Sequence, residues 1–167
     1  MNSDMKSQTG AIMSLGGGCF YSKSTKQKVN IKSSTEAELV GASDMSGQIL
    51  WTLRFLQSQG YDVRRNILYQ DNKSAILLEK NGQLSSSQRT KHINVRYFFM
   101  KDRVEDGEIE VVYCPTGEMV GDYFTKPLQG KKFEQFRVFI MGLNLVSAQE
   151  RVGGSGDTIK IAKDSGF

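Results

Sequence analysis

The sequence predicts an α/β domain in which helices flank a mixed β-sheet. Two short apolar segments on either side of Gly16–Gly18 predict a β-hairpin. Segments with helical and strand periodicity then alternate along the chain, an order typical of α/β domains. A length of 167 residues suits one domain. We expect that domain to span residues 1–145, followed by a polar, Gly/Ser-rich, disordered tail over 146–167.

Local sequence patterns predict five elements in the first half of the chain. The hairpin strands are expected over 10–15 and 19–24. A long helix is expected over 35–58, because Gly60 stands where a glycine commonly ends a helix. A short apolar strand at 66–70 is followed by a helix over 72–80, which stops at Asn81-Gly82.

The second half begins with a Ser- and Gln-rich loop over 83–90. Helical spacing of apolar residues predicts helices over 91–106 and 131–141. Between them, alternation predicts a strand over 108–113 and a short helix over 117–125, after Pro115. In the tail, β-branched residues make 158–162 a candidate strand.

Composition excludes several classes of protein. No apolar run approaches the roughly 20 residues that span a bilayer, and the N-terminus has no apolar signal segment. Cys19 and Cys114 are far apart in sequence and lack CxxC spacing, which argues against a zinc site or a disulfide framework. The net charge of +4 comes from residues 1–35, which hold five lysines and one aspartate. That excess suits contact with a polyanion, although a solvated lysine-rich hairpin would look the same.

Glu38 is the first of three candidate catalytic acids. On a helical projection it lies at the centre of the apolar stripe of the long helix, whereas Glu36 points to the opposite face. A buried acid is costly unless it is paired, hydrogen-bonded or bound to a cation. Helix capping is the alternative, because both Ser33-x-x-Glu36 and Thr35-x-x-Glu38 fit a capping box.

Asp71 and Asp122 are the other two candidates. Asp71 directly follows the strand 66–70, at the strand end where α/β sheets usually bind ligands, although Asp71 or Asn72 could simply cap the next helix. Asp122 lies on the short helix after strand 108–113. Carboxylates that converge from separate elements suit two Mg²⁺ ions and phosphoryl transfer.

Four segments resemble the ribonuclease H domain of copia-type retrotransposon polyproteins. They are, in order, Ser33-Ser34-Thr35-Glu36-Ala37-Glu38, Asp71-Asn72-Lys73-Ser74-Ala75-Ile76, Thr90-Lys91-His92-Ile93 and Asp122-Tyr123-Phe124-Thr125-Lys126-Pro127-Leu128. The resemblance covers about residues 5–130 and implies a ribonuclease H-like fold. It also implies that Glu38, Asp71 and Asp122 are catalytic and bind two Mg²⁺ ions, for which Mn²⁺ can substitute.

The resemblance implies cleavage of the RNA strand of an RNA–DNA hybrid during reverse transcription. Its partners would be the hybrid and the polymerase domain of the same polyprotein, in cytoplasmic virus-like particles or the nucleus, without a membrane. Selection for RNA rests on contacts to 2′-hydroxyl groups. The candidate nucleic-acid contacts are Asn72, Ser74, Arg89, Lys91, His92 and Lys126. For His92 and the basic residues, capping or plain surface exposure is the alternative.

The family has a further aspartate on a central strand that precedes the position where this chain begins. Asp4 lies several residues too late to replace it. We therefore expect a sheet without its central strand and a chain that has lost most hydrolytic activity. The competing hypothesis is an inactive module that binds nucleic acid or packs against the polymerase domain.

Overall fold

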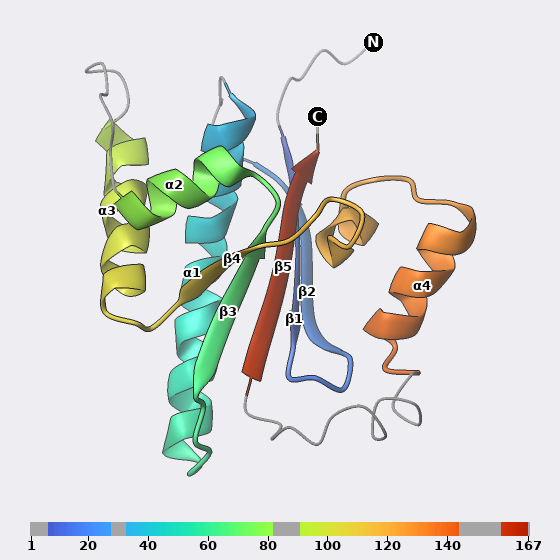
Figure 1. The fold of residues 1–167 in the computed structure, drawn as a ribbon, viewed down its shortest axis with the longest axis horizontal. Coiled ribbons are helices and arrows are strands. Elements are labelled where there is room, and N and C mark those ends of the chain that lie inside the picture. The colour runs from blue at the N-terminus through green and yellow to red at the C-terminus, as the bar shows by residue number, and fades with distance from the viewer. Residues whose placement is uncertain (1–6, 28–32, 82–90, 144–157, 167) are drawn as a thin grey trace.

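A computed structural model of the chain describes residues 7–27, 33–81, 91–143 and 158–166 (Figure 1). It confirms the predicted α/β class and the mixed sheet, and the arrangement is consistent with a ribonuclease H-like fold. The strands are β1 (Gln8–Ser14), β2 (Cys19–Lys26), β3 (Arg65–Gln70), β4 (Glu110–Tyr113) and β5 (Thr158–Gly166). The helices are α1 (Ser34–Ser58), α2 (Lys73–Asn81), α3 (Lys91–Glu105), the 3₁₀ helix η1 (Val120–Phe124) and α4 (Gly130–Ile140).

The five strands form one sheet in the order β2-β1-β5-β3-β4. The strand β1 is antiparallel to both β2 and β5, and β3 is parallel to both β4 and β5. The last strand in the sequence therefore lies at the centre of the sheet, where Figure 1 shows β5 in red between β1 and β3.

The expected disordered tail and gapped sheet are wrong for residues 158–166. These residues pair with β1 along one edge and with β3 along the other, so neither inner edge is left open. Position Ile161 pairs with both Met13 and Leu68, which are fully buried. A β-branched apolar residue suits that central position. The remainder of the predicted tail, residues 146–157, lies outside the described residues.

Helices cover both faces of the sheet. On one face, α1 packs against β3 and β5, and α2 and α3 pack beside α1. The core of that face includes Ala11, Met13 and Leu68. The alternate residues Ile12 and Tyr69 instead line a cleft with Val120 of η1 and Phe139 of α4, so η1 and α4 cover the opposite face.

Several predicted elements have different ends in the structure, and the two nearest the candidate site concern the strand β4 and the helix η1. The strand expected from residue 108 begins at Glu110, because Gly107 has a positive φ of 71° and the Glu108 carbonyl accepts a hydrogen bond from Asn66. The short helix expected over 117–125 is a 3₁₀ helix of five residues. Cys19 and Cys114 are both free thiols. Within the described ranges, no helix combines the length and apolarity that a bilayer span requires.

Candidate active site

The long helix α1 delivers Glu38 as the sequence predicted. Its N-cap is Ser33, whose side chain accepts a hydrogen bond from the backbone N–H of Glu36 at 3.2 Å. The capping alternative for Glu38 is therefore wrong, because the cap belongs to Ser33 and Glu36. Glu38 is only 2% exposed and lies in line with Ala42 and Met45, which are buried in the core.

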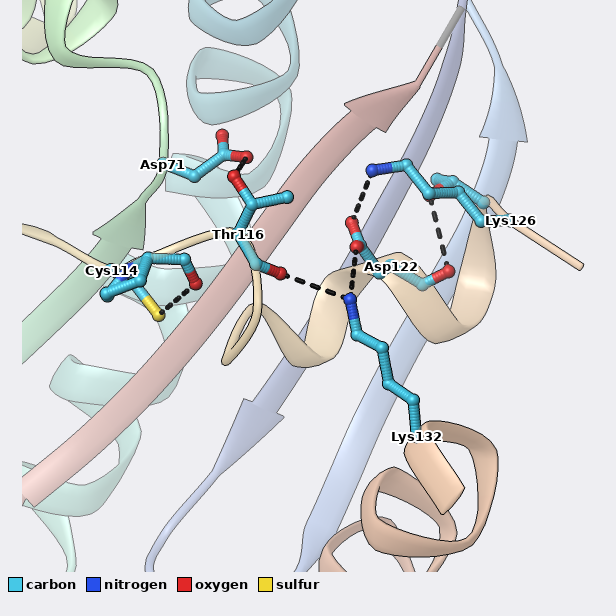
Figure 2. Close-up of polar contacts among 8 residues, drawn as sticks. Asp71, Cys114, Thr116, Asp122, Lys126 and Lys132 are labelled. Atoms are coloured by element: carbon cyan, nitrogen blue, oxygen red, sulfur yellow. Dashed lines mark hydrogen bonds and ion pairs between the residues drawn. The ribbon is translucent and has the colours of Figure 1, made fainter. Parts of the chain in front are cut away.

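Asp71 and Asp122 come from opposite sides of β5. Asp71 directly follows β3, the neighbour of β5 on one side. Asp122 belongs to η1, which packs against β1 and β5. Asp122 is 1% exposed. Figure 2 shows the two aspartates at the same end of the sheet, with the β5 ribbon passing between the elements that carry them.

The three predicted acids influence one another electrostatically. Burial raises the pKa of Asp71, and the negative charge of Glu38 raises it further. A hydrogen bond from the Thr116 hydroxyl lowers that pKa in part, and Asp122 contributes a smaller upward shift. The same acids act on the neighbouring Cys114 thiol, whose pKa is raised first by burial and then by negative charges that include Asp71 and Asp122. The positive charge of Lys126 lowers the Asp71 pKa slightly, so acids and a lysine act together at the carboxyl end of β3.

Both carboxylate oxygens of Asp122 are bound by lysines. The Nζ atom of Lys126 lies 2.9 Å from Oδ1, and the Nζ atom of Lys132 lies 3.2 Å from Oδ2 (Figure 2). These two ammonium groups neutralise a carboxylate that is almost fully buried.

A chain of polar contacts connects the two aspartates. Lys132 Nζ also donates to the backbone carbonyl of Thr116 at 3.2 Å, and the Thr116 hydroxyl donates to Asp71 Oδ2 at 3.1 Å (Figure 2). Thr116 lies in the turn between β4 and η1. Asp71 and Asp122 are therefore connected through Thr116 and Lys132.

Gly10 allows η1 to lie directly on the sheet. A Cβ atom at this position would come within 2.5 Å of Thr125 Cγ2 and 2.8 Å of the Gly121 carbonyl oxygen. Real Cβ atoms do not approach other atoms so closely. The glycine therefore sets the depth at which the 3₁₀ helix presents Asp122.

The donor chemistry of the three acids fits Mg²⁺, which prefers oxygen ligands and carboxylates in particular. As arranged here, however, no three His, Cys, Asp or Glu side chains of the described residues are grouped closely enough to hold an ion. Lysines take the Asp122 oxygens instead. A divalent cation at Asp122 would have to displace at least one of these ammonium groups.

The residues predicted to contact nucleic acid differ in their positions and partners in the structure. Asn72 is the N-cap of α2, because its Oδ1 accepts hydrogen bonds from the N–H groups of Ser74 and Ala75 at 3.0 and 3.1 Å. The capping alternative is thus confirmed for Asn72, whereas Ser74 is exposed. Lys126 binds Asp122. Arg89 lies outside the described residues, as do the side chains of Lys91 and His92 in the first turn of α3.

Sequence reasoning missed Lys132 and Thr116. Neither belongs to a segment that resembles the family, and each lies on a different element from the acid that it contacts. The spacing of Asp122 and Lys126 at i and i+4 was a usable signal for the first lysine. No comparable signal joins Lys132 to Asp122, because only the packing of α4 against η1 brings them together.

Comparison with known proteins finds relatives among retrotransposon polyproteins. The chain is 37% identical over 129 residues to the retrovirus-related Pol polyprotein from transposon TNT 1-94 of Nicotiana tabacum, which covers 77% of this chain and 10% of that protein. It is 34% identical over 134 residues to the Pol polyprotein from transposon RE1 of Arabidopsis thaliana, covering 80% of this chain and 9% of that protein. Identity is 28% over 131 residues to the transposon Ty1-JR2 Gag-Pol polyprotein of Saccharomyces cerevisiae, covering 77% of this chain and 7% of that protein.

No family model matches the chain, and no solved structure matches it. The chain spans a tenth or less of the length of the curated relatives named above. The retrotransposon origin expected from the sequence is confirmed at this level. The chain is homologous to a segment of retrotransposon Pol polyproteins.

Proposed function

We propose that this chain is a ribonuclease H domain that hydrolyses the RNA strand of RNA–DNA hybrids. The observation that carries the proposal is that Glu38 of α1 and Asp122 of η1 both act electrostatically on Asp71, which directly follows β3. Their order and sequence contexts are those of the copia-type domain. The Pol relatives support an origin in a polyprotein that also contains a polymerase.

The chain's own residues would position the reacting phosphate rather than react with it covalently. Asp71 is held by the Thr116 hydroxyl, and Asp122 is held by two lysines. Mg²⁺, when bound by these carboxylates, would supply an activated water and stabilise the leaving oxygen. Released from Asp122, the ammonium groups of Lys126 and Lys132 would be available to a phosphate backbone. The proposal places the domain beside its polymerase in virus-like particles.

Asn72 is a candidate for recognising RNA. Its Oδ1 is engaged in capping α2, so a contact to a 2′-hydroxyl would use Nδ2 as the donor. Ser74, in the first turn of α2, is exposed. Both residues follow the proposed metal ligand within three positions.

A binding module without catalysis is the second candidate. The specific observation in its favour is that lysines bind both Asp122 oxygens. In that case the lysines would be permanent neutralising partners, and the acids would not take up a divalent cation. The two hypotheses therefore differ in their response to Mg²⁺.

The test is cleavage of a labelled RNA–DNA hybrid by the chain with 5 to 10 mM Mg²⁺, taken as roughly saturating for a carboxylate site that retains waters. Glu38→Gln should reduce the rate by about 100-fold or more, whereas the matched change Glu36→Gln, at a half-buried position in the first turn of α1, should leave it within about twofold. Equal loss in both variants would refute the assignment of Glu38. A folded chain that binds the hybrid but cleaves nothing, in Mg²⁺ or Mn²⁺, would refute the enzyme and leave the binding module.

A further inference from the structure

Thr116 reaches the candidate site from a turn whose backbone is fixed on both sides of it. Before it, the backbone N–H of Cys114 donates to the carbonyl of Gln70 at 2.9 Å, which ties the turn to the residue that precedes Asp71. After it, Met119 is fully buried, and its N–H donates to the Thr116 carbonyl at 3.4 Å. The fold therefore sets the position of the Thr116 hydroxyl, although the residue itself is exposed.

The Asp71 carboxylate depends on a partner of this kind. The backbone on either side of Asp71 is held, because the Gln70 side-chain oxygen also accepts a hydrogen bond from the N–H of Asn72 at 3.2 Å. The side chain has more freedom, since the χ2 angle of an aspartate is broadly distributed and lets the carboxylate rotate. Among the described residues, the Thr116 hydroxyl makes the one hydrogen bond to this carboxylate, at 3.1 Å from Oδ2 (Figure 2). This bond restricts the rotation and leaves Oδ1 for a ligand.

Thr116 differs in charge from the partners of Asp122. Both Asp122 oxygens contact ammonium groups, those of Lys126 and Lys132, which neutralise that carboxylate. A threonine hydroxyl is a neutral donor, so it orients Asp71 without cancelling its negative charge. Carboxylates that bind metal ions are commonly oriented by such hydrogen bonds from neighbouring groups. The contact to Thr116 therefore suits a carboxylate that receives a cation.

We propose that Thr116 is a positioning residue, whose hydroxyl orients the Asp71 carboxylate to bind a divalent cation. This inference rests on the proposed function and adds to it a residue outside the four segments that resemble the family. Thr116 acts through Asp71. Lys132 extends the arrangement, because its ammonium donates at 3.2 Å both to the Thr116 carbonyl and to Asp122 Oδ2.

Titration of the full chain with Mn²⁺, followed by the electron paramagnetic resonance signal of the free ion, tests this inference without requiring activity. Thr116→Val removes the hydroxyl and keeps the branched shape, and it should weaken Mn²⁺ binding by about tenfold. Thr116→Ser retains the hydroxyl and should bind Mn²⁺ as the unaltered chain does. The matched control is Thr25→Val, at an exposed position on the outer strand β2, which should also leave binding unchanged.

A purely structural role for Thr116 would give a different pattern. Because Thr116 is exposed, Thr116→Val should unfold in EDTA at nearly the same temperature as the unaltered chain. In hybrid cleavage at a fixed Mg²⁺ concentration, this variant should have a lower kcat and a nearly unchanged KM, since the contacts that bind the hybrid are retained. A large fall in the unfolding temperature in EDTA would assign Thr116 a structural role and overturn the inference.

The outcomes separate this inference from the proposed function. Absence of Mn²⁺ binding and of cleavage by the unaltered, folded chain would overturn both. Cleavage by the unaltered chain, with equal Mn²⁺ affinity in Thr116→Val, would overturn the role of Thr116 and leave the proposed function standing. Equally weak Mn²⁺ binding by Thr116→Val and Thr116→Ser would also overturn that role, because the serine retains the hydroxyl.

Discussion

Lys132 should act as a stabilising stand-in for a metal ion, and its removal should therefore have opposite consequences with and without Mg²⁺. Lys132→Met keeps most of the side-chain length but deletes the ammonium, which lies 5.3 Å from the centre of the Phe136 ring. Asp122, which is 1% exposed, then keeps only Lys126 as a cationic partner. A buried carboxylate that loses neutralising charge destabilises the folded state.

The structure sets the size of this effect. Lys132 Nζ makes two hydrogen bonds of 3.2 Å, one to the Asp122 carboxylate and one to the Thr116 carbonyl. Hydrogen bonds that involve a charged group contribute roughly 1.5–3 kcal/mol when buried. The Lys132 side chain is 35% exposed, and solvent screening reduces the expected loss to about 1–2 kcal/mol. For a chain of this length, that loss lowers Tm by about 2–8 °C.

The assay is thermal unfolding of the chain and of Lys132→Met, in EDTA and in Mg²⁺. In EDTA the variant should unfold at the lower temperature. In Mg²⁺ the variant should gain more stability than the unaltered chain, because the ion no longer competes with this ammonium for Asp122. Lys131→Met, at the exposed neighbouring position, is the control and should follow the unaltered chain in both conditions. Equal responses to Mg²⁺ in all three proteins would refute the stand-in role.

Three further predictions concern the sheet and the acids. Gly10→Ala should cost about 1–3 kcal/mol, since its Cβ would overlap Thr125, whereas Gly47→Ala, with nothing within 4 Å, should be neutral or stabilising in chemical denaturation. Because burial and Glu38 raise the Asp71 pKa in the folded state, stability in EDTA should fall as pH rises from the unfolded aspartate pKa through the raised value. Asp71→Asn should therefore be more stable than the unaltered chain at pH values above the folded pKa of Asp71, and equally stable below the unfolded pKa. A stability difference between the two proteins that does not change with pH would contradict this. Backbone amides of residues 158–166 should exchange with solvent as slowly as those of β1, and fast exchange throughout would exclude the central strand.

Local sequence signals predicted most of the architecture. Apolar phasing placed Glu38 on the buried face of α1, because a helix of 25 residues repeats its pattern often enough to define that face. Asp71 was found because a short apolar strand ends directly before it. These features depend on residues close together in the sequence, so one chain is sufficient to detect them.

The central strand could not be predicted because its pairing is entirely non-local. Lys160 argued against a central position, since such strands are normally apolar on both faces. In the structure position Lys160 pairs with Ser14, the last residue of β1, on one side and with Ile67 of β3 on the other.

Crystals of the full chain grown with Mn²⁺ test the central claim most directly, since anomalous scattering locates the ion independently of any activity. We predict β5 between β1 and β3 and a manganese peak within about 2.5 Å of carboxylate oxygens of Asp71 and Asp122, with at least one lysine displaced from Asp122. A well-ordered structure with both lysines still on Asp122 and no manganese among these aspartates would contradict the account.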